Sequence, residues 1–168
     1  EIGARVGNAA SIQLFFDGFH PQGTSGVFVG AAAAGRLLNL NSALMLDCLG
    51  IAGSQAGGLM AAQEGAMVKR FHSGRAAQSG IYSALLAQKG LTGISNVLEA
   101  GYGGYLSTYS TSPKPERLLS GLGEEVNKTT SFATHHHHRR AVLLVRFLCF
   151  FPYFPPTAAR SPHTRAPL

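Results

Sequence analysis

Two short segments of the sequence place a histidine beside an expected helix start. They are GFHPQGTSG at 18–26 and VKRFHSGRAAQSG at 68–80. In the first segment, His20 is followed by proline and then by the expected helix start. Free backbone N–H groups and the helix dipole at such a start favour a bound carboxylate, and the imidazole can donate or accept a proton. The segment therefore predicts an anion site with acid–base chemistry.

The second segment adds positive charge to the same kind of arrangement. Lys69, Arg70 and His72 lie within four residues, just before a helix expected to begin at Ser73. Three potentially cationic groups at a helix start favour an acidic substrate. A structural interpretation stays open beside this one. A single histidine is more often a hydrogen-bonded structural residue than a catalyst, and a Lys-Arg pair is more often part of a solvated turn.

The elements that must position these residues are expected to be helices. The run TSGVFVGAAAAGRLLNL at 24–40 is apolar or small on nearly every side, which is typical of a helix buried all round. Asn41 can cap the next helix, at 42–56, whose apolar residues recur at helical spacing. These two segments indicate a mainly α fold.

A third helix is predicted at 73–89, with Ser73 as N-cap and Gly90 as the stop. Its inward face is predicted to consist of its large aliphatic residues, Ile81, Leu85 and Leu86.

Shorter elements are expected further along. A short helix could form at 94–100, and the following GYGGYLSTYS is too glycine-rich to continue it. Pro115 suits the first turn of a last short helix, which Gly121 would stop. No alternating strand pattern precedes residue 125.

The net charge of +6 is unevenly distributed along the sequence. Residues 1–125 carry eight basic and eight acidic side chains, so this part is neutral. The excess comes from Lys128 and five arginines beyond it. No basic-aromatic pattern of a nucleic-acid platform is present. The apolar run at 141–154 is shorter than the ~20 residues that a membrane span needs. We therefore expect neither a specific nucleic-acid partner nor membrane insertion.

The last segment, 126–168, differs in composition from the rest. It has no glycine and no acidic residue, and it holds five of the eight prolines and four consecutive histidines, 135–138. We interpret it as an atypical basic tail that is disordered or arises from an error in the gene model, such as a frameshift. The histidine run would bind metal only adventitiously, so no metal site is predicted.

Two cysteines, Cys48 and Cys149, fit neither a disulfide framework nor a zinc site, and a reducing compartment is the default. We expect a cytoplasmic location, with a mitochondrial one as the alternative. The chain opens on Glu1 without a methionine, and we interpret it as an interior piece of a larger protein.

Four consecutive pieces of the sequence carry a family resemblance. In this order and spacing, they resemble the central stretch of the MmgE/PrpD family over residues 1–125. The resemblance implies part of a large all-helical domain, with the family's α/β lid domain essentially missing. It also implies a lyase for citrate-like tricarboxylic acids, which dehydrates 2-methylcitrate or decarboxylates cis-aconitate without metal or organic cofactor. The pieces are GFHPQGTSGVFVGAAAAGRLLNL, LGIAGSQAGGLMAAQEG, VKRFHSGRAAQSGIYSALLAQKGLTG and VLEAGYGGYLSTYS.

The resemblance also assigns roles to the two motifs. His20 stands at the histidine of G-[FW]-H-P, and Lys69 stands at the lysine of K-R-[FL]-H-x-G. His20 would then move a proton and Lys69 would hold a substrate carboxylate, with His72 and Arg70 as further substrate-binding residues. The resemblance also implies a homodimer for the intact family protein. We expect the chain alone to be inactive, and the alternative is a non-catalytic helical protein that packs on a full-length relative.

Overall fold

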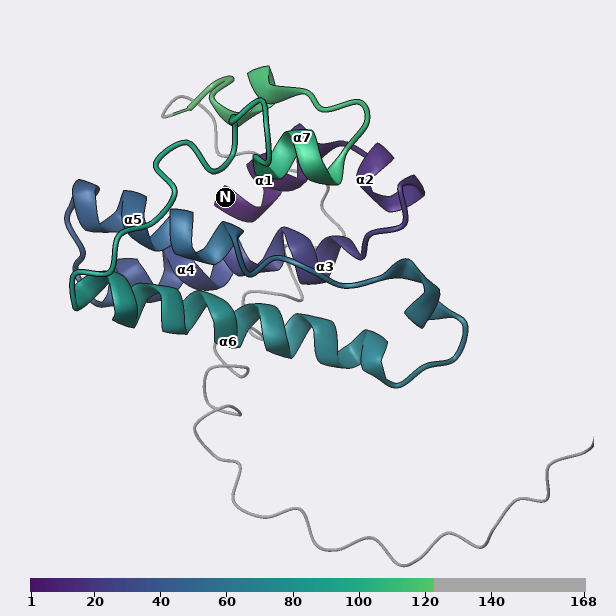
Figure 1. Cartoon of the computed structure of the whole chain (residues 1–168), viewed down its shortest axis with the longest axis horizontal. Coiled ribbons are helices and arrows are strands. Elements are labelled where there is room, and N and C mark those ends of the chain that lie inside the picture. Colours follow the sequence, from purple (N-terminus) through teal and green to yellow (C-terminus); the bar gives the residue numbers. More distant parts are fainter. Residues whose placement is uncertain (123–168) are drawn as a thin grey trace, which may run out of the picture. The chain divides into compact units, whose positions relative to one another are not determined.

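The described part of the chain is helical. The computed structural model describes residues 1–122, and no strand forms within them. An isolated antiparallel bridge joins Phe19 to Leu59. This confirms the predicted fold class. The helices are α1 (Ile2–Ala10), α2 (Gln13–Phe16), α3 (Pro21–Thr24), α4 (Gly26–Leu37), α5 (Ser42–Gly53), η1 (Met60–Gln63), α6 (Val68–Gln88), α7 (Tyr105–Tyr109) and η2 (Pro115–Leu118) (Figure 1).

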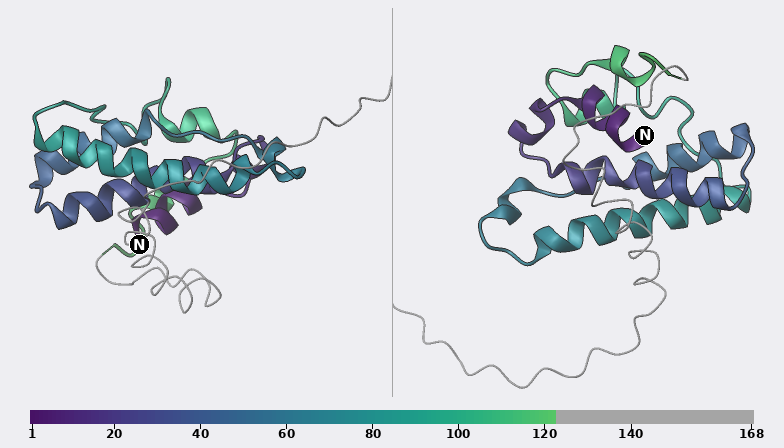
Figure 2. Two further views of the ribbon diagram at one scale, coloured as in Figure 1. Left: turned by 90° about the horizontal axis from the view of Figure 1, so that it is seen from below. Right: turned by 180° about the vertical axis from the view of Figure 1, so that it is seen from behind.

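Helices α4, α5 and α6 pack against one another, and α6 runs along α4 (Figures 1 and 2). The buried face of α6 consists of small residues, which let the two backbones come close. A Cβ atom added at Gly80 would overlap the backbone of Gly30 and Ala31 in α4. Only glycine fits this crossing, because any side chain would force the helices apart. The buried residues of α6 are Ala76, Ser79, Gly80, Ser83, Ala84 and Ala87.

The largest fully buried side chain is Phe28 of α4. Its ring meets the ring of Tyr105 edge to face, with 5.0 Å between centroids. Leu14, Val6 and Val27 are also fully buried and extend this core towards the N-terminal helices. Burying a side chain such as phenylalanine contributes about 1.5–3 kcal/mol. The core therefore fixes α7 against the first turn of α4.

A buried arginine ties the two ends of the described part together. The Nη1 group of Arg5 in α1 donates hydrogen bonds to the carbonyl oxygens of Leu118 at 3.0 Å and Ser120 at 2.8 Å. Its guanidinium also pairs with Glu1 at 2.9 Å. Because a buried charge must keep its partners, this network holds η2 against α1.

Several predicted helix ends are confirmed. The backbone N–H of Leu44 donates to Oδ1 of Asn41 at 3.0 Å, so Asn41 caps α5. Gly90 follows the end of α6 with φ of 91°, a conformation that glycine adopts without cost. Pro115 begins η2, and Gly121 has φ of 61° just beyond it.

The prediction for the third helix was wrong at its start and on its buried face. Helix α6 begins at Val68, so Ser73 lies inside it rather than at the N-cap. Ile81, Leu85 and Leu86 are exposed instead of facing inward. The physical reason is the close approach of α4. Only small side chains fit between the two backbones, and the large apolar residues are left on the opposite side.

Two further predictions need correction. Residues 95–99 form turns rather than a helix at 94–100, and the next helix, α7, starts directly after Gly104.

The apolar run at 24–40 is not buried all round. Its main helix is α4, Gly26–Leu37, in which Val29 is 48% exposed and Leu37 is 76% exposed. Within residues 1–122, one side of this helix is therefore uncovered.

The predictions for the basic tail, the histidine run and the apolar run at 141–154 lie outside the described residues. So does the predicted domain boundary at 125. Among the helices of residues 1–122, none combines the length and hydropathy of a membrane span.

Candidate functional site

The backbone around His20 is held by a short pairing with a later loop. The N–H of His20 donates to the carbonyl oxygen of Gly58 at 3.0 Å, and the N–H of Met60 donates to that of Gly18 at 2.8 Å. The carbonyl oxygen of His20 in turn accepts from the N–H and the hydroxyl of Thr24, as helix α3 begins. The predicted helix start after His20 is thus confirmed, and these bonds fix the backbone of His20.

Helix α6 brings a second histidine to the first. The Nδ1 atoms of His20 and His72 lie 3.0 Å apart, and their ring centroids lie 5.1 Å apart. His20 is buried, with 6% of its surface exposed, while His72 is half-buried. Lys69 lies three residues before His72 on α6, and residues at this spacing are neighbours on a helix surface. Two sequence segments 50 residues apart therefore meet in a histidine pair with a lysine beside it.

The electrostatics of the site favour a neutral His20. Burial lowers the pKa of His20 below its ordinary value of 6.5, and the positive charges of His72 and Lys69 lower it further. Burial acts because the charged imidazolium loses water, and the neighbouring cations act because like charges repel. At neutral pH, His20 is therefore an uncharged imidazole in a locally positive environment.

A glycine makes room for the pair. Gly58 has φ of 126°, and a Cβ atom added there would lie 3.0 Å from Nδ1 of His72. An L side chain at this position would be strained by the backbone and would press on the imidazole. Because the carbonyl of Gly58 also binds His20, one residue sets the position of both rings.

Helix α7 contacts the two segments that position His20. The hydroxyl of Tyr109 donates to the carbonyl oxygen of Ala56 at 2.8 Å, and its ring packs edge to face on Phe19 at 4.8 Å. The hydroxyls of Tyr105 and Ser25 lie 2.8 Å apart. Burial raises the pKa of both tyrosines, which keeps them protonated. Sequence reasoning missed this support. The two tyrosines four residues apart, after the glycine-rich turn, were the available signal.

Comparison with known proteins gives this arrangement its context. The family model described as MmgE/PrpD N-terminal domain matches residues 1–118, which include both histidines and Lys69. The chain belongs to the MmgE/PrpD family. The family resemblance of the four consecutive sequence pieces is thereby confirmed.

The similar curated members of the MmgE/PrpD family are named cis-aconitate decarboxylases, which are lyases. One from Aspergillus terreus is 42% identical over 130 residues, which cover 73% of this chain and 26% of the relative. A cis-aconitate decarboxylase-like protein from Aspergillus oryzae is 40% identical over 136 residues, or 77% and 28%. The human enzyme is 41% identical over 99 residues, or 58% and 20%. The chain thus spans about a quarter of the length of the relatives it matches.

Arg70 is placed differently from the other residues predicted for the MmgE/PrpD site. Because α6 begins at Val68, Lys69 and Arg70 both lie in its first turn. The side chain of Arg70 is exposed and makes no hydrogen bond or ion pair within residues 1–122. Cations in a first turn add to the positive field of the helix start instead of cancelling it. The described residues contain no group of three or more potential metal ligands.

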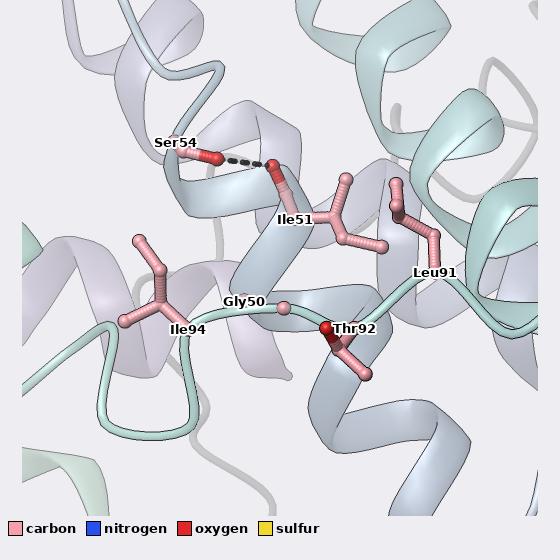
Figure 3. A pocket seen from close by; sticks show the side chains of 7 residues that line it. Gly50, Ile51, Ser54, Leu91, Thr92 and Ile94 are labelled. Atoms are coloured by element: carbon pink, nitrogen blue, oxygen red, sulfur yellow. Dashed lines mark hydrogen bonds between the residues drawn. The ribbon is translucent and has the colours of Figure 1, made fainter.

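A surface pocket of about 350 Å³ lies elsewhere, between α5 and the segment that follows α6 (Figure 3). Its lining has no charged side chain, and the hydroxyl of Ser54, just beyond α5, donates to the carbonyl oxygen of Ile51 at 3.0 Å. Such a lining offers no cation to pair with a carboxylate, so the histidine pair remains the candidate site. The pocket is lined by Gly50, Ile51, Ser54, Leu91, Thr92, Gly93 and Ile94.

Proposed function

We propose that His20, Lys69 and His72 form part of a site that binds a polycarboxylic acid in a lyase, with cis-aconitate decarboxylation as the reaction. One observation carries this proposal. A buried imidazole lies 3.0 Å from a second imidazole, and the charged groups that act on it are both basic. The names of the relatives favour decarboxylation of cis-aconitate over the alternative dehydration of 2-methylcitrate.

The lysine is the carboxylate-binding group of the proposed site. An ammonium group paired with a carboxylate forms a charge-assisted hydrogen bond, which is stronger than a neutral one. Lys69 has this chemistry, and its position in the first turn of α6 places it at the positive end of the helix. The exposed Arg70 can attract the anion at longer range.

The reaction needs one proton, and His20 can supply it. Decarboxylation breaks the carbon–carbon bond to one carboxylate and releases CO₂. The electron pair of that bond forms a new double bond, and the electrons of the old double bond take a proton at carbon. A protonated imidazole next to this carbon is a suitable general acid, so the pair of His20 and His72 must hold one extra proton before the reaction. For the dehydration alternative, the neutral imidazole of His20 would instead remove a proton.

Binding and turnover are two separate expectations for this chain. The chain spans about a quarter of its relatives' length, so we expect it to bind the substrate but to lack turnover by itself.

Calorimetric titration of the full chain with cis-aconitate and with 2-methylcitrate tests the site. We expect Lys69→Ala to weaken binding of cis-aconitate at least about tenfold, which corresponds to about 1.4 kcal/mol. The matched control is Lys89→Ala, which removes a lysine just beyond the other end of α6 and should leave the affinity unchanged. Equal losses in both variants, or no loss in either, would reject the assigned role of Lys69.

An exposed apolar face favours a second candidate function, that of a non-catalytic protein that packs on another family member, as in a dimer. Tyr82 is 53% exposed on α6, and Leu85 and Leu86 are about two-fifths exposed. Apolar side chains grouped in this way often mark a protein interface. Mixing the chain with a full-length relative in analytical ultracentrifugation should give a complex that Leu85→Glu abolishes and Gln88→Glu retains. A chain that stays separate from the relative excludes this function.

A further inference from the structure

We propose that His72 is a positioning residue for His20. In this arrangement, the Nδ1–H group of His72 donates to Nδ1 of His20, so that His20 carries its own hydrogen on Nε2. The consequence for catalysis rests on the proposed function, whereas the arrangement itself does not.

The geometry requires one donor and one acceptor. With the two Nδ1 atoms 3.0 Å apart, there is room for a single hydrogen between them. A neutral imidazole bears hydrogen on one ring nitrogen and has a lone pair on the other. One histidine must therefore be the Nδ1–H tautomer, and the other must be the Nε2–H tautomer.

Burial decides which histidine donates. His20 is 6% exposed, whereas His72 is half-buried and closer to water. When the pair takes up an extra proton, the cation is better hydrated on His72, and a doubly protonated ring can only donate. His72 is then the donor to His20. In the neutral pair the same direction leaves the bare Nε2 lone pair on His72, where water can reach it.

The charged surroundings support the same direction. Lys69 and His72 of α6 are the groups whose charge acts on His20. The other elements beside it, α3 and the loop 54–59, contain no charged residue. No described acidic group in these elements therefore offsets the repulsion between an extra proton on the buried His20 and the nearby positive charge. The extra proton of the pair is therefore better placed on His72.

The loop between α5 and η1 fixes the two rings relative to each other. The carbonyl of Gly58 accepts from the N–H of His20, while its Cα lies against the ring of His72. A Cβ atom at this position would also approach Cε1 of His72, at 3.3 Å. The pair is therefore set by the backbone rather than by chance rotamers of two free side chains.

In the proposed reaction this arrangement makes a proton relay. His20 gives its Nε2 proton to the substrate carbon, and its Nδ1 takes the proton that a cationic His72 holds. The pair loses one proton in total, which ends in the new C–H bond, and His72 returns to the neutral form. Water at the half-buried ring of His72 can then restore the proton.

Nitrogen-15 NMR of histidine-labelled full chain, without ligand, tests the arrangement, because a ring nitrogen that bears hydrogen resonates well apart from a bare one. We expect His20 to show the Nε2–H pattern in the wild type and in His72→Asn, whose amide can still donate near the Nδ1 position. In His72→Leu, which has no donor, His20 should become a mixture of tautomers. Lys69→Ala, the charge control, should leave the pattern unchanged.

Circular dichroism of each variant shows that the helices persist, and His72→Asn keeps the test decisive if His72→Leu fails to fold. An Nδ1–H pattern for His20 in the wild type would overturn the proposal. A pure Nε2–H pattern for His20 that persists in folded His72→Leu would also overturn it. So would the loss of the Nε2–H pattern in folded His72→Asn. Since no ligand is present, none of these results depends on whether the chain binds cis-aconitate.

Discussion

The two halves of α6 show how one helix can serve packing and chemistry at once. From Ala76 onward, its buried face has small residues only, and Gly80 touches the backbone of α4. The first turns carry Lys69 and His72 at the surface, where α3 and the Gly58 loop meet the helix. Close packing of the second half of α6 on α4 also holds the first half in position, because α6 is one continuous, stiff helix.

The largest effect is expected in the core beside α4, the helix on which the packed half of α6 lies. Truncation by Phe28→Ala should destabilise the chain by about 3–5 kcal/mol, because it empties a fully buried site next to Tyr105. Urea unfolding followed by circular dichroism measures the loss. The matched control is Phe16→Ala at a ring that is 69% exposed, where the change should stay within about 0.5 kcal/mol. Similar losses at both positions would contradict the assigned core.

A second test compares two glycines of α6 by the same substitution. Gly80→Ala should destabilise by about 1–3 kcal/mol, since the methyl group overlaps the backbone of α4. Gly74→Ala should instead stabilise by up to about 1 kcal/mol, because the space there is open and alanine favours the helix. Thermal unfolding gives both values. If the two variants shift the midpoint in the same direction, α4 and α6 do not cross at Gly80.

The functional half is tested by Gly58→Ala. We expect a loss of about 1–2 kcal/mol from the positive φ, together with displacement of the ring of His72. Histidine resonances should report the displacement, and unfolding curves should report the energy. For the control Gly57→Ala, where an added Cβ meets nothing within 4 Å, both measurements should stay close to wild type. An unchanged histidine spectrum in Gly58→Ala would mean that the glycine does not set the pair.

The smallest effect is the pH dependence of stability. Because the pKa of His20 is lowered in the folded chain, the unfolded chain binds more protons below pH 6.5. The contribution of His20 to the free energy of unfolding is therefore fully present above pH 6.5. It is lost as the pH falls through this value towards the pKa of His20 in the folded chain. Urea unfolding between pH 7.5 and 5 should show this decline, and His20→Asn should flatten it. A decline of equal slope in His20→Asn would assign it to other groups.

Local patterns predicted some helix ends correctly, but they missed the start and the buried face of α6. The Asn41 cap and the Gly90 stop depend on neighbouring residues alone, and both were predicted correctly. Leu85 and Leu86 were assigned to the interior because large aliphatic residues are usually buried, but the approach of α4 leaves room only for small ones. That approach is a long-range property of the fold, which no single helix pattern contains.

The sequence predicted two separate motifs, at 18–26 and 68–80, but not the contact between their histidines. The residue types and the family resemblance indicated His20 and Lys69, while the contact of His20 with His72 depends on how α3 and α6 meet. The supporting role of Gly58 follows from the same contact. The assigned roles of His20, Lys69, His72 and Arg70 all stay predictions. Arg70 differs from the other three in that its side chain is exposed.

Following the ring resonances of His20 and His72 in the full chain during titration with cis-aconitate is the most direct test of the proposed site. We expect both rings to shift together and saturably, and the shifts to need at least about tenfold more ligand in Lys69→Ala but not in Lys89→Ala. Saturable binding that leaves both rings unmoved, or that moves the amides around Thr92 instead, would contradict the account.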